Sequence, residues 1–478
     1  MASIPDEIFF ATIVEINQRL KAREFSVVEL TRAFSERLER LGPRYNALAL
    51  SIRPQALRAA KQIDGDLKRE RFRGPLQGIP FGAKDLLAYK GHPTTWGAKP
   101  FAGQVFDYTA HSLTRLSETG AVLIGKLAMV ELAGGGGYRM ASASLTGAGL
   151  NPWDKSRWSG GSSSGSGIAV AAGLVPYALG SETSGSILWP SAYCGVTGLR
   201  PTYGLVSRHG AMSLSWSMDK IGTICRSADD CGHVLHVLAG KDSKDPASSG
   251  KSFYYTPEYS RRFKDLKIGF AAADFDQWVD AEARPDFAKA LETMRGLGAQ
   301  LIPVKLPDLP YAAIASTIVL AEAGSVFEPL VRSGEVDLLA DRKQSAGLRA
   351  ALDIPARDYL RAMRLRSLVQ QAFHELFAEV DVVITPTRPG GAPKVSQPLP
   401  TAPYDREGPD ERGLTQHIPA GNLAGVPALS LPCGFAAGLP IGMTVMGPPF
   451  SENTLLSVGR EFQKATDWHR RRPPVPAT

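Results

Sequence analysis

Short apolar runs alternate with helical stretches along most of the chain. From about Gly74 the apolar runs are too short to form helices, and they cover residues 79–81, 121–124, 178–179, 382–384, 428–431 and 443–446. Between them lie stretches with helical periodicity, such as residues 127–133 and 455–462. Strands separated by helices are typical of an α/β protein whose sheet is covered by helices on both faces.

The first seventy residues differ, because their pattern is helical. Ser26 and Glu29 have the spacing of a capping box, and Leu30, Phe34 and Leu38 follow on one helical face. We therefore expect an N-terminal helical region over residues 1–70 that packs on a main domain over residues 71–474.

The middle of the main domain begins with a polar segment and is otherwise largely helical. Residues 241–260 are polar and rich in glycine and serine, which favours an exposed connection. The region up to about residue 380 is largely helical, and strand-like runs resume after it. We interpret residues 241–380 as a mostly helical lobe or insertion within one fold.

Composition and charge narrow the function classes. The chain has 478 residues, 44% of them apolar and 21% charged, as in ordinary globular proteins. Its net charge of +7 is spread thinly, without a run of five basic residues. A surface that tracks phosphates needs clustered cations, so we expect no nucleic-acid partner.

The same features predict a soluble cytoplasmic protein with neither metal nor cofactor. The longest apolar stretch that we identify, residues 168–179, contains Gly173 and Pro176 and is too short to span a bilayer. The four cysteines form no C-x-x-C pair, which is typical of reduced cytosolic proteins, and no histidine or cysteine cluster has metal-ligand spacing.

Three glycine motifs resemble known phosphate-binding, dinucleotide-binding or catalytic motifs, but each lacks a feature that the motif requires. The segment 120–127 approaches a P-loop, but Leu127 lacks the hydroxyl that would hold Mg²⁺ and the preceding run is strand-like, so a strand is the better interpretation. A dinucleotide fingerprint beginning at Gly165 would need glycine where Val170 stands. Residues 161–165 fit the nucleophile elbow G-x-S-x-G around Ser163, but residues 153–159 are too polar for the buried strand that an elbow requires.

Two serine- and glycine-rich loops carry the most information. Residues 159–167 lead directly into an apolar helical run, so their amides lie at a helix N-terminus, although such a tract can also be a flexible linker. A second loop, residues 180–187, follows one helix and one short strand later.

Lys84 ends an apolar run that is flanked by glycines. A lysine next to an aspartate, here Asp85, usually forms a solvated pair on the surface. If Lys84 is buried instead, it loses its proton more easily and can act as a base.

Together these segments resemble the amidase signature family in order and spacing over nearly the whole chain. The matching segments are residues 81–85, 93–95, 151–154, 160–163, Ser186 with its loop, 194–204, 383–387, 422–428 and 438–442. The resemblance implies a large mixed β-sheet and an amidase domain over residues 71–474. It also implies a Ser-Ser-Lys triad with Ser186 as nucleophile, Ser162 as the bridging serine held by a cis peptide, and Lys84 as base. The backbone amides of Thr183, Ser184, Gly185 and Ser186 would form the oxyanion hole.

The chain departs from the family pattern around this site. Ser164 and Ser184 stand where glycine is usual, Glu182 where aspartate is usual, and Leu188-Trp189 where arginine normally begins the segment. Loss of that arginine predicts a more apolar rim. We expect the substrate pocket to include Gly136, Gly137, Tyr138, Leu188 and Trp189.

We therefore expect a hydrolase of small-molecule amides or carbamates (urethanes) with apolar or aromatic groups, compatible with a homo-oligomer. The alternative within the family is the glutaminase subunit of a tRNA-dependent amidotransferase, which would need partner subunits. The apolar rim argues against glutamine, which is small and zwitterionic. A different class is a catalytically silent binding protein on the same fold.

Overall fold

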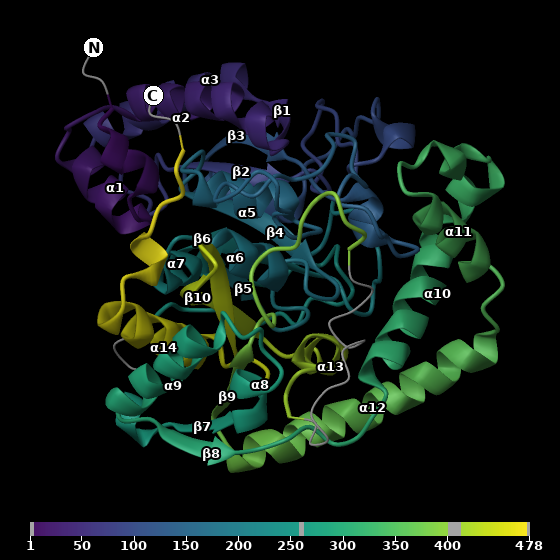
Figure 1. Ribbon diagram of the computed structural model, residues 1–478. Coiled ribbons are helices and arrows are strands. Elements are labelled where there is room, and N and C mark those ends of the chain that lie inside the picture. Colours follow the sequence, from purple (N-terminus) through teal and green to yellow (C-terminus); the bar gives the residue numbers. More distant parts are fainter. Residues whose placement is uncertain (1–3, 258–261, 400–412, 476–478) are drawn as a thin grey trace.

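The computed structural model describes residues 4–257, 262–399 and 413–475. One mixed sheet crosses the molecule, with strand order β1-β3-β2-β4-β6-β5-β10-β11-β9-β7-β8 (Figure 1). The strands are β1 (Leu48–Ser51), β2 (Pro80–Lys84), β3 (Val122–Leu127), β4 (Tyr177–Glu182), β5 (Thr197–Arg200), β6 (Lys220–Cys225), β7 (Lys267–Phe270), β8 (Gln300–Pro303), β9 (Val382–Pro386), β10 (Ala428–Ala436) and β11 (Leu439–Met446). This arrangement confirms the predicted α/β class with a large mixed sheet.

Helices cover the sheet and fill its margins. They are α1 (Ile13–Lys21), α2 (Val27–Leu41), α3 (Arg53–Lys68), α4 (His111–Glu118), α5 (Ser164–Ala171), α6 (Leu188–Cys194), α7 (Ala228–Leu238), α8 (Ala272–Asp276), α9 (Arg284–Gly296), α10 (Tyr311–Arg332), α11 (Arg342–Ala351), α12 (Ala356–Glu379), α13 (His417–Ala424) and α14 (Glu452–Ala465). The predicted capping box is present, because Ser26 Oγ accepts from the Glu29 amide at 3.1 Å while the Ser26 amide donates to Glu29 at 2.9 Å.

The central strands place the predicted site. Strand β2 runs parallel to both β3 and β4, and β4 runs antiparallel to β6. Every residue of β2 and β4 is buried, so groups at their C-terminal ends lie under the surrounding loops. Lys84 and Glu182 are the last residues of these two neighbouring strands.

One predicted helix is wrong. Residues 127–133 do not form an α-helix, because β3 continues to Leu127 and the chain then makes a short 3₁₀ turn. Leu132 and Ala133 have left-handed φ values of 50° and 53°, and Gly134 follows at 95°. A left-handed backbone cannot continue a right-handed helix.

Residues 241–380 contribute more than helices. They supply β7 and β8 to the sheet, and α10 and α12 contact each other at one margin of the molecule (Figure 1). Helix α10 has 22 residues and is apolar enough by composition to span a membrane, a stretch that our sequence analysis missed. It nevertheless carries buried Glu322, which accepts from Ser215 Oγ at 2.6 Å and from Tyr359 Oη at 2.9 Å, so one face of the helix packs against the rest of the fold.

Candidate active site

Lys84 lies at the centre of the site, fully buried at the end of β2. Its Nζ donates to Ser162 Oγ at 2.7 Å and to Ser181 Oγ at 2.9 Å. Burial lowers the pKa of Lys84 to about 7, against the opposing effect of the carboxylates of Asp219 and Glu182. A large fraction of Lys84 is therefore neutral near pH 7 and can accept a proton.

The first serine loop is built on close backbone contacts. The peptide bond between Gly161 and Ser162 is cis, and Gly160 has φ +85°. A Cβ at Gly160 would lie 2.8 Å from the backbone of Pro190, so only glycine fits. The amide of Ser163 donates to the carbonyl of Ser186 at 3.3 Å, which ties this loop to the second one.

Ser163, the centre of the elbow-like motif, is engaged elsewhere. Its Oγ donates to the carbonyl of Ser181 at 3.2 Å and accepts from the Ser181 amide at 3.3 Å. The side chain is fully buried and does not line the cavity beside Ser186. The geometry favours a structural role for this hydroxyl.

Glu182 holds the second loop. Its Oε2 accepts from the amides of Ile187 and Leu188 at 2.9 and 3.0 Å, while its Oε1 accepts from Arg200 at 2.9 Å and from Asn422 at 3.0 Å. Burial alone would raise the pKa of Glu182, but Arg200 and these donors hold it below its usual value. The carboxylate thus clamps both ends of the turn that contains Ser186.

The amides of this turn point to no protein acceptor. Within the described part of the chain, the backbone amides of Ser184, Gly185 and Ser186 make no hydrogen bond. Gly185 has φ +90°. Free amides in a tight turn are the groups that stabilise a developing oxyanion.

A cavity of about 400 Å³ opens onto Ser186. It is lined by four of the five residues that we expected in a substrate pocket, namely Gly136, Gly137, Tyr138 and Trp189. Leu188 does not: its side chain is fully buried in a core cluster with Met218. The reason is that Leu188 begins α6, so it and Trp189 point in different directions from the helix.

Sequence reasoning missed several other groups that the structure brings here. Trp158, Tyr193, Arg139, Lys343 and Arg388 line the same cavity. Arg388 restores a cation beside Trp189, with its guanidinium carbon 4.7 Å from the Trp189 ring centre. The rim is therefore less apolar than the loss of the family arginine suggested. Long-range contacts of this kind leave no periodic signal in the sequence.

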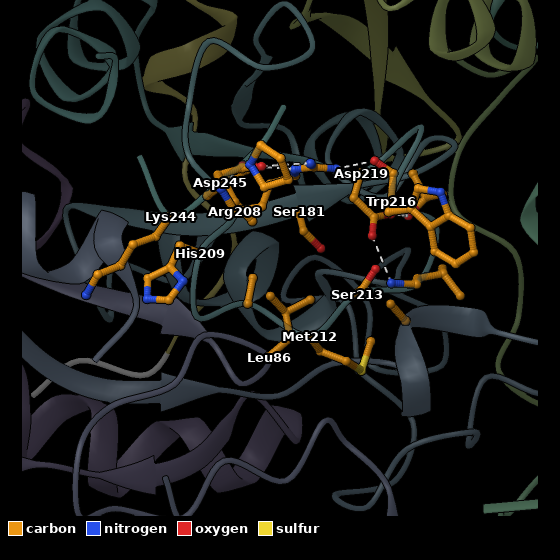
Figure 2. A pocket seen from close by; sticks show the side chains of 16 residues that line it. Leu86, Ser181, Arg208, His209, Met212, Ser213, Trp216, Asp219, Lys244 and Asp245 are labelled. Atoms are coloured by element: carbon orange, nitrogen blue, oxygen red, sulfur yellow. Dashed lines mark hydrogen bonds and ion pairs between the residues drawn. The ribbon is translucent and has the colours of Figure 1, made fainter. Parts of the chain in front are cut away.

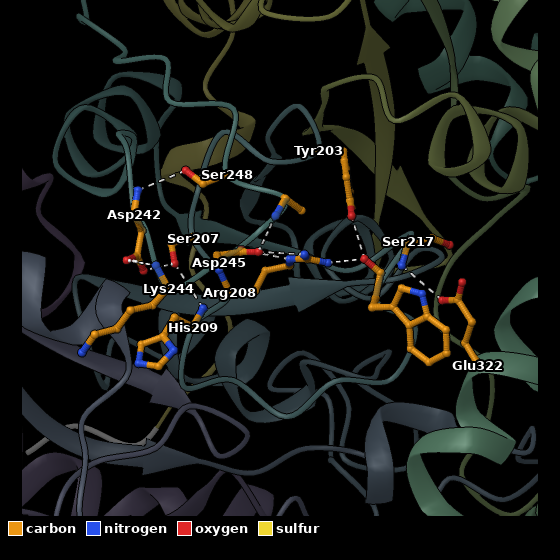
Figure 3. A network of polar contacts seen from close by, with 12 residues as sticks. Tyr203, Ser207, Arg208, His209, Ser217, Asp242, Lys244, Asp245, Ser248 and Glu322 are labelled. Atoms are coloured by element: carbon orange, nitrogen blue, oxygen red, sulfur yellow. Dashed lines mark hydrogen bonds and ion pairs between the residues drawn. The ribbon is translucent and has the colours of Figure 1, made fainter.

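A second cavity of about 230 Å³ is lined by Ser181, Met212 and Asp219, among others (Figure 2). It lies beside the first cavity, because Ala133, Thr183 and Leu214 line both. Asp219 accepts from Thr183 Oγ1 at 2.6 Å and from the amide of Leu214 at 2.8 Å. Arg208 and Asp245 also line this second cavity, and they pair at 3.0 Å (Figure 3). The hydrogen bond from Thr183 to Asp219 thus holds the start of the Ser186 loop.

The P-loop-like segment forms a strand, as interpreted. Its Lys126 belongs to β3 and pairs with Asp85 at 2.7 Å, and both side chains are buried. Asp85 is therefore a buried ion-pair partner of Lys126, not a surface partner of Lys84.

Comparisons with known proteins match nearly the whole chain. A family model described as Amidase matches residues 29–456. A glutamyl-tRNA(Gln) amidotransferase subunit of Chloroflexus aggregans is 37% identical over 504 aligned residues, covering 98% of this chain and 99% of the relative. The native peptide amidase of Stenotrophomonas maltophilia superposes with a TM-score of 0.83 at 29% identity, covering 98% and 99% of the two chains. A bacterial aryl acylamidase of the amidase signature family shares the fold, with a TM-score of 0.87 at 22% identity and coverage of 99% and 100%.

These relatives overturn one expectation. We predicted a small-molecule amide or carbamate as the partner and no nucleic acid, whereas the matched amidotransferase subunit carries tRNA and an assembly of subunits in its name. The prediction is wrong because it rested on the charge distribution of one chain. In an assembly, the cationic surface that meets a nucleic acid can belong to another subunit.

Proposed function

The chain belongs to the amidase family and is an enzyme of C–N bonds; from this premise we propose that it cleaves amides through an acyl-enzyme on Ser186. The observation that carries the proposal is the contact of 2.7 Å between Lys84 Nζ and Ser162 Oγ, next to the loop of Ser186. A lysine whose pKa is lowered to about 7 can act as a base in that position.

In the proposed reaction, protons pass from Ser186 through Ser162 to Lys84 and then return by the same route. Neutral Lys84 takes the proton of Ser162, which takes the proton of Ser186 as Ser186 Oγ bonds to the carbonyl carbon. The carbonyl oxygen becomes an oxyanion that the free amides of residues 184–186 stabilise. Ser162 then returns a proton to the nitrogen as the C–N bond breaks, and the amine leaves. Water attacks the ester by the same relay and releases the acid and Ser186.

Carbamates (urethanes) fit the same scheme, because their carbonyl forms the same tetrahedral oxyanion. We include them in the proposed range on that chemical ground.

A second candidate is favoured by the identity of 37% to the Chloroflexus amidotransferase subunit over 98% of the chain. Under it, the amide is glutamine, and the reaction serves a tRNA-dependent amidotransferase with partner subunits. The cavity offers Arg388 to a carboxylate, but no Asp or Glu among the described residues lines it to receive an ammonium group.

The test is a hydrolysis panel with matched variants. Wild type, Ser186→Ala and Ser163→Ala are compared on aliphatic amides, anilides, aryl carbamates and glutamine, and a fluorophosphonate probe reports an activated serine. Hydrolysis and labelling that depend on Ser186 support the first proposal, whereas an unlabelled, inactive wild type would contradict it and favour a binding protein. Glutamine hydrolysis that appears only with amidotransferase partner subunits and glutamyl-tRNA would select the second candidate.

A further inference from the structure

Asp219 is a buried carboxylate that the proposed proton relay does not use. It directly precedes β6, whose first residue, Lys220, is paired in register with Glu182 at the end of β4. The next residues outward on the two strands are Asp219 and Thr183, and Thr183 Oγ1 donates to Asp219 Oδ1 at 2.6 Å. Asp219 therefore contacts the chain at the point where the turn of Ser186 begins.

Within the described part of the chain, the side chain of Asp219 accepts hydrogen bonds from uncharged donors alone. Besides the hydroxyl of Thr183, the amides of Leu214 and Ser215 donate to its Oδ2 at 2.8 and 2.9 Å. An ionised carboxylate accepts at both oxygens, so this set of donors fits the anion. None of the ion pairs among the described residues includes Asp219, so no contact cancels its charge.

Two cations act on Asp219 without pairing with it. Lys220 is its buried neighbour in the chain, and Lys220 Nζ donates to the carbonyl of Met218. Arg208 lines the same second cavity but pairs with Asp245 at 3.0 Å. Burial raises the pKa of Asp219, while its hydrogen-bond donors and the charge of Lys220 oppose that rise.

The proposed base is close to the same carboxylate. Lys84 Nζ donates to Ser181 Oγ at 2.9 Å, and Ser181 stands two residues before Thr183. Ser181, Thr183 and Asp219 line the second cavity together (Figure 2). Burial lowers the pKa of Lys84 to about 7, and the charge of Asp219 opposes this fall more than that of Glu182 does.

The reaction needs Lys84 to hold a proton as well as to take one. Burial favours the neutral amine, so a buried lysine takes a proton readily only where the resulting ammonium is stabilised. A carboxylate whose charge is not cancelled stabilises that ammonium. Asp219 supplies such a charge and also holds the residue at which the oxyanion turn begins.

We propose that Asp219 is a positioning residue of the reaction: its charge stabilises protonated Lys84, and its contact with Thr183 holds the oxyanion turn. This assignment rests on the proposed acyl-enzyme at Ser186 with Lys84 as base. The two effects are separable, because the charge and the hydrogen bond can be removed one at a time.

Asp219→Asn removes the charge and can keep the hydrogen bonds. Its amide oxygen can accept from the amides of Leu214 and Ser215, while its NH₂ donates to Thr183 Oγ1, because a hydroxyl also accepts. Loss of the anion disfavours protonated Lys84, so the inflection of kcat/KM against pH should move about one unit below that of wild type. The plateau rate should fall more on an amide than on the matched ester, since expelling an amine needs the returned proton.

Asp245→Asn is the matched control. It removes a carboxylate that lines the same cavity but pairs with Arg208, so the inflection should stay at the wild-type pH. The position of an inflection does not depend on how much of a variant is folded, so a loss of stability in either variant does not imitate the effect.

Thr183→Val removes the hydrogen bond and leaves Asp219 charged. We expect kcat to fall about tenfold or more, as for one lost hydrogen bond to a charged group, with the inflection unchanged. Thr183→Ser should recover most of the rate, because it restores the hydroxyl.

Each half of the proposal has its own contrary result. An inflection that Asp219→Asn leaves in place would overturn the effect on Lys84, and full activity of Thr183→Val would overturn the hold on the turn. Either result, with hydrolysis that still depends on Ser186, would leave the proposed function standing. The rate of fluorophosphonate labelling against pH measures the same inflection without an amide. A wild type that is labelled at Ser186 but cleaves no amide would contradict the proposed function, and the labelling rates of the variants would then decide the role of Asp219.

Discussion

Replacing Glu182 by glutamine tests whether its carboxylate holds the nucleophile loop. Two donors face Oε1 and two face Oε2, so either orientation of the new amide turns its NH₂ toward two donors. The change also leaves the fully buried Arg200 without its counterion. Removing one partner of a buried ion pair costs about 3–5 kcal/mol, and we expect a loss of that size in the free energy of unfolding. Displacement of the Ser186 turn by about 1 Å should lower kcat about 100-fold.

The assay is urea unfolding followed by tryptophan fluorescence, together with amide hydrolysis below the transition. Glu461→Gln is the matched control, because its pair with Lys464 at 2.6 Å is on the surface and should be worth less than about 1 kcal/mol. The double variant Glu182→Gln with Arg200→Met should cost less than the sum of the two single changes, because it removes the unpaired charge. A loss below about 1 kcal/mol for Glu182→Gln, equal to that of the surface control, would refute the clamp.

Four further results are expected. The stability that Glu182 supplies should be present above the ordinary carboxyl pKa of 4.5 and be lost as pH falls below it toward the lowered folded pKa, and unfolding curves from pH 7 to about pH 2 check this. Ser186→Ala should lower kcat at least about 1,000-fold, while Ser163→Ala keeps substantial activity; the reverse pattern would assign the nucleophile to Ser163. Because only neutral Lys84 is a base and its pKa is about 7, kcat/KM should fall about tenfold per pH unit below that value and level off above it, and a flat profile from pH 5 to 8 would contradict this. Lys84→Ala should lower amide turnover more than ester turnover, since expelling an amine needs the returned proton; an unchanged amide-to-ester ratio would exclude this role.

The elements around the site were predictable where local pattern and tertiary environment agree. The apolar run before Lys84 predicted a buried strand, and Ser26 with Glu29 predicted a helix start, because both signals are local. The helix predicted over residues 127–133 is wrong, because two residues in this segment have a left-handed backbone that apolar periodicity does not reveal. Arg388 was unpredictable, since it meets Trp189 from a segment about 200 residues away in the chain.

The sequence pattern also does not show which of two buried lysines, Lys84 or Lys126, is the base. Lys84 and Lys126 both end apolar runs, lie on adjacent parallel strands and are fully buried. Ala83 pairs with Lys126, so alternation along β2 turns Lys84 toward the opposite face from Lys126. Lys126 there meets Asp85 at 2.7 Å, and this carboxylate opposes the fall in pKa that burial causes. Lys84 instead meets the hydroxyls of Ser162 and Ser181, which carry no charge to hold its proton. Two lysines that look alike in sequence are therefore separated into an ion-pair member and a base by the nearest oxygen that the fold brings to each.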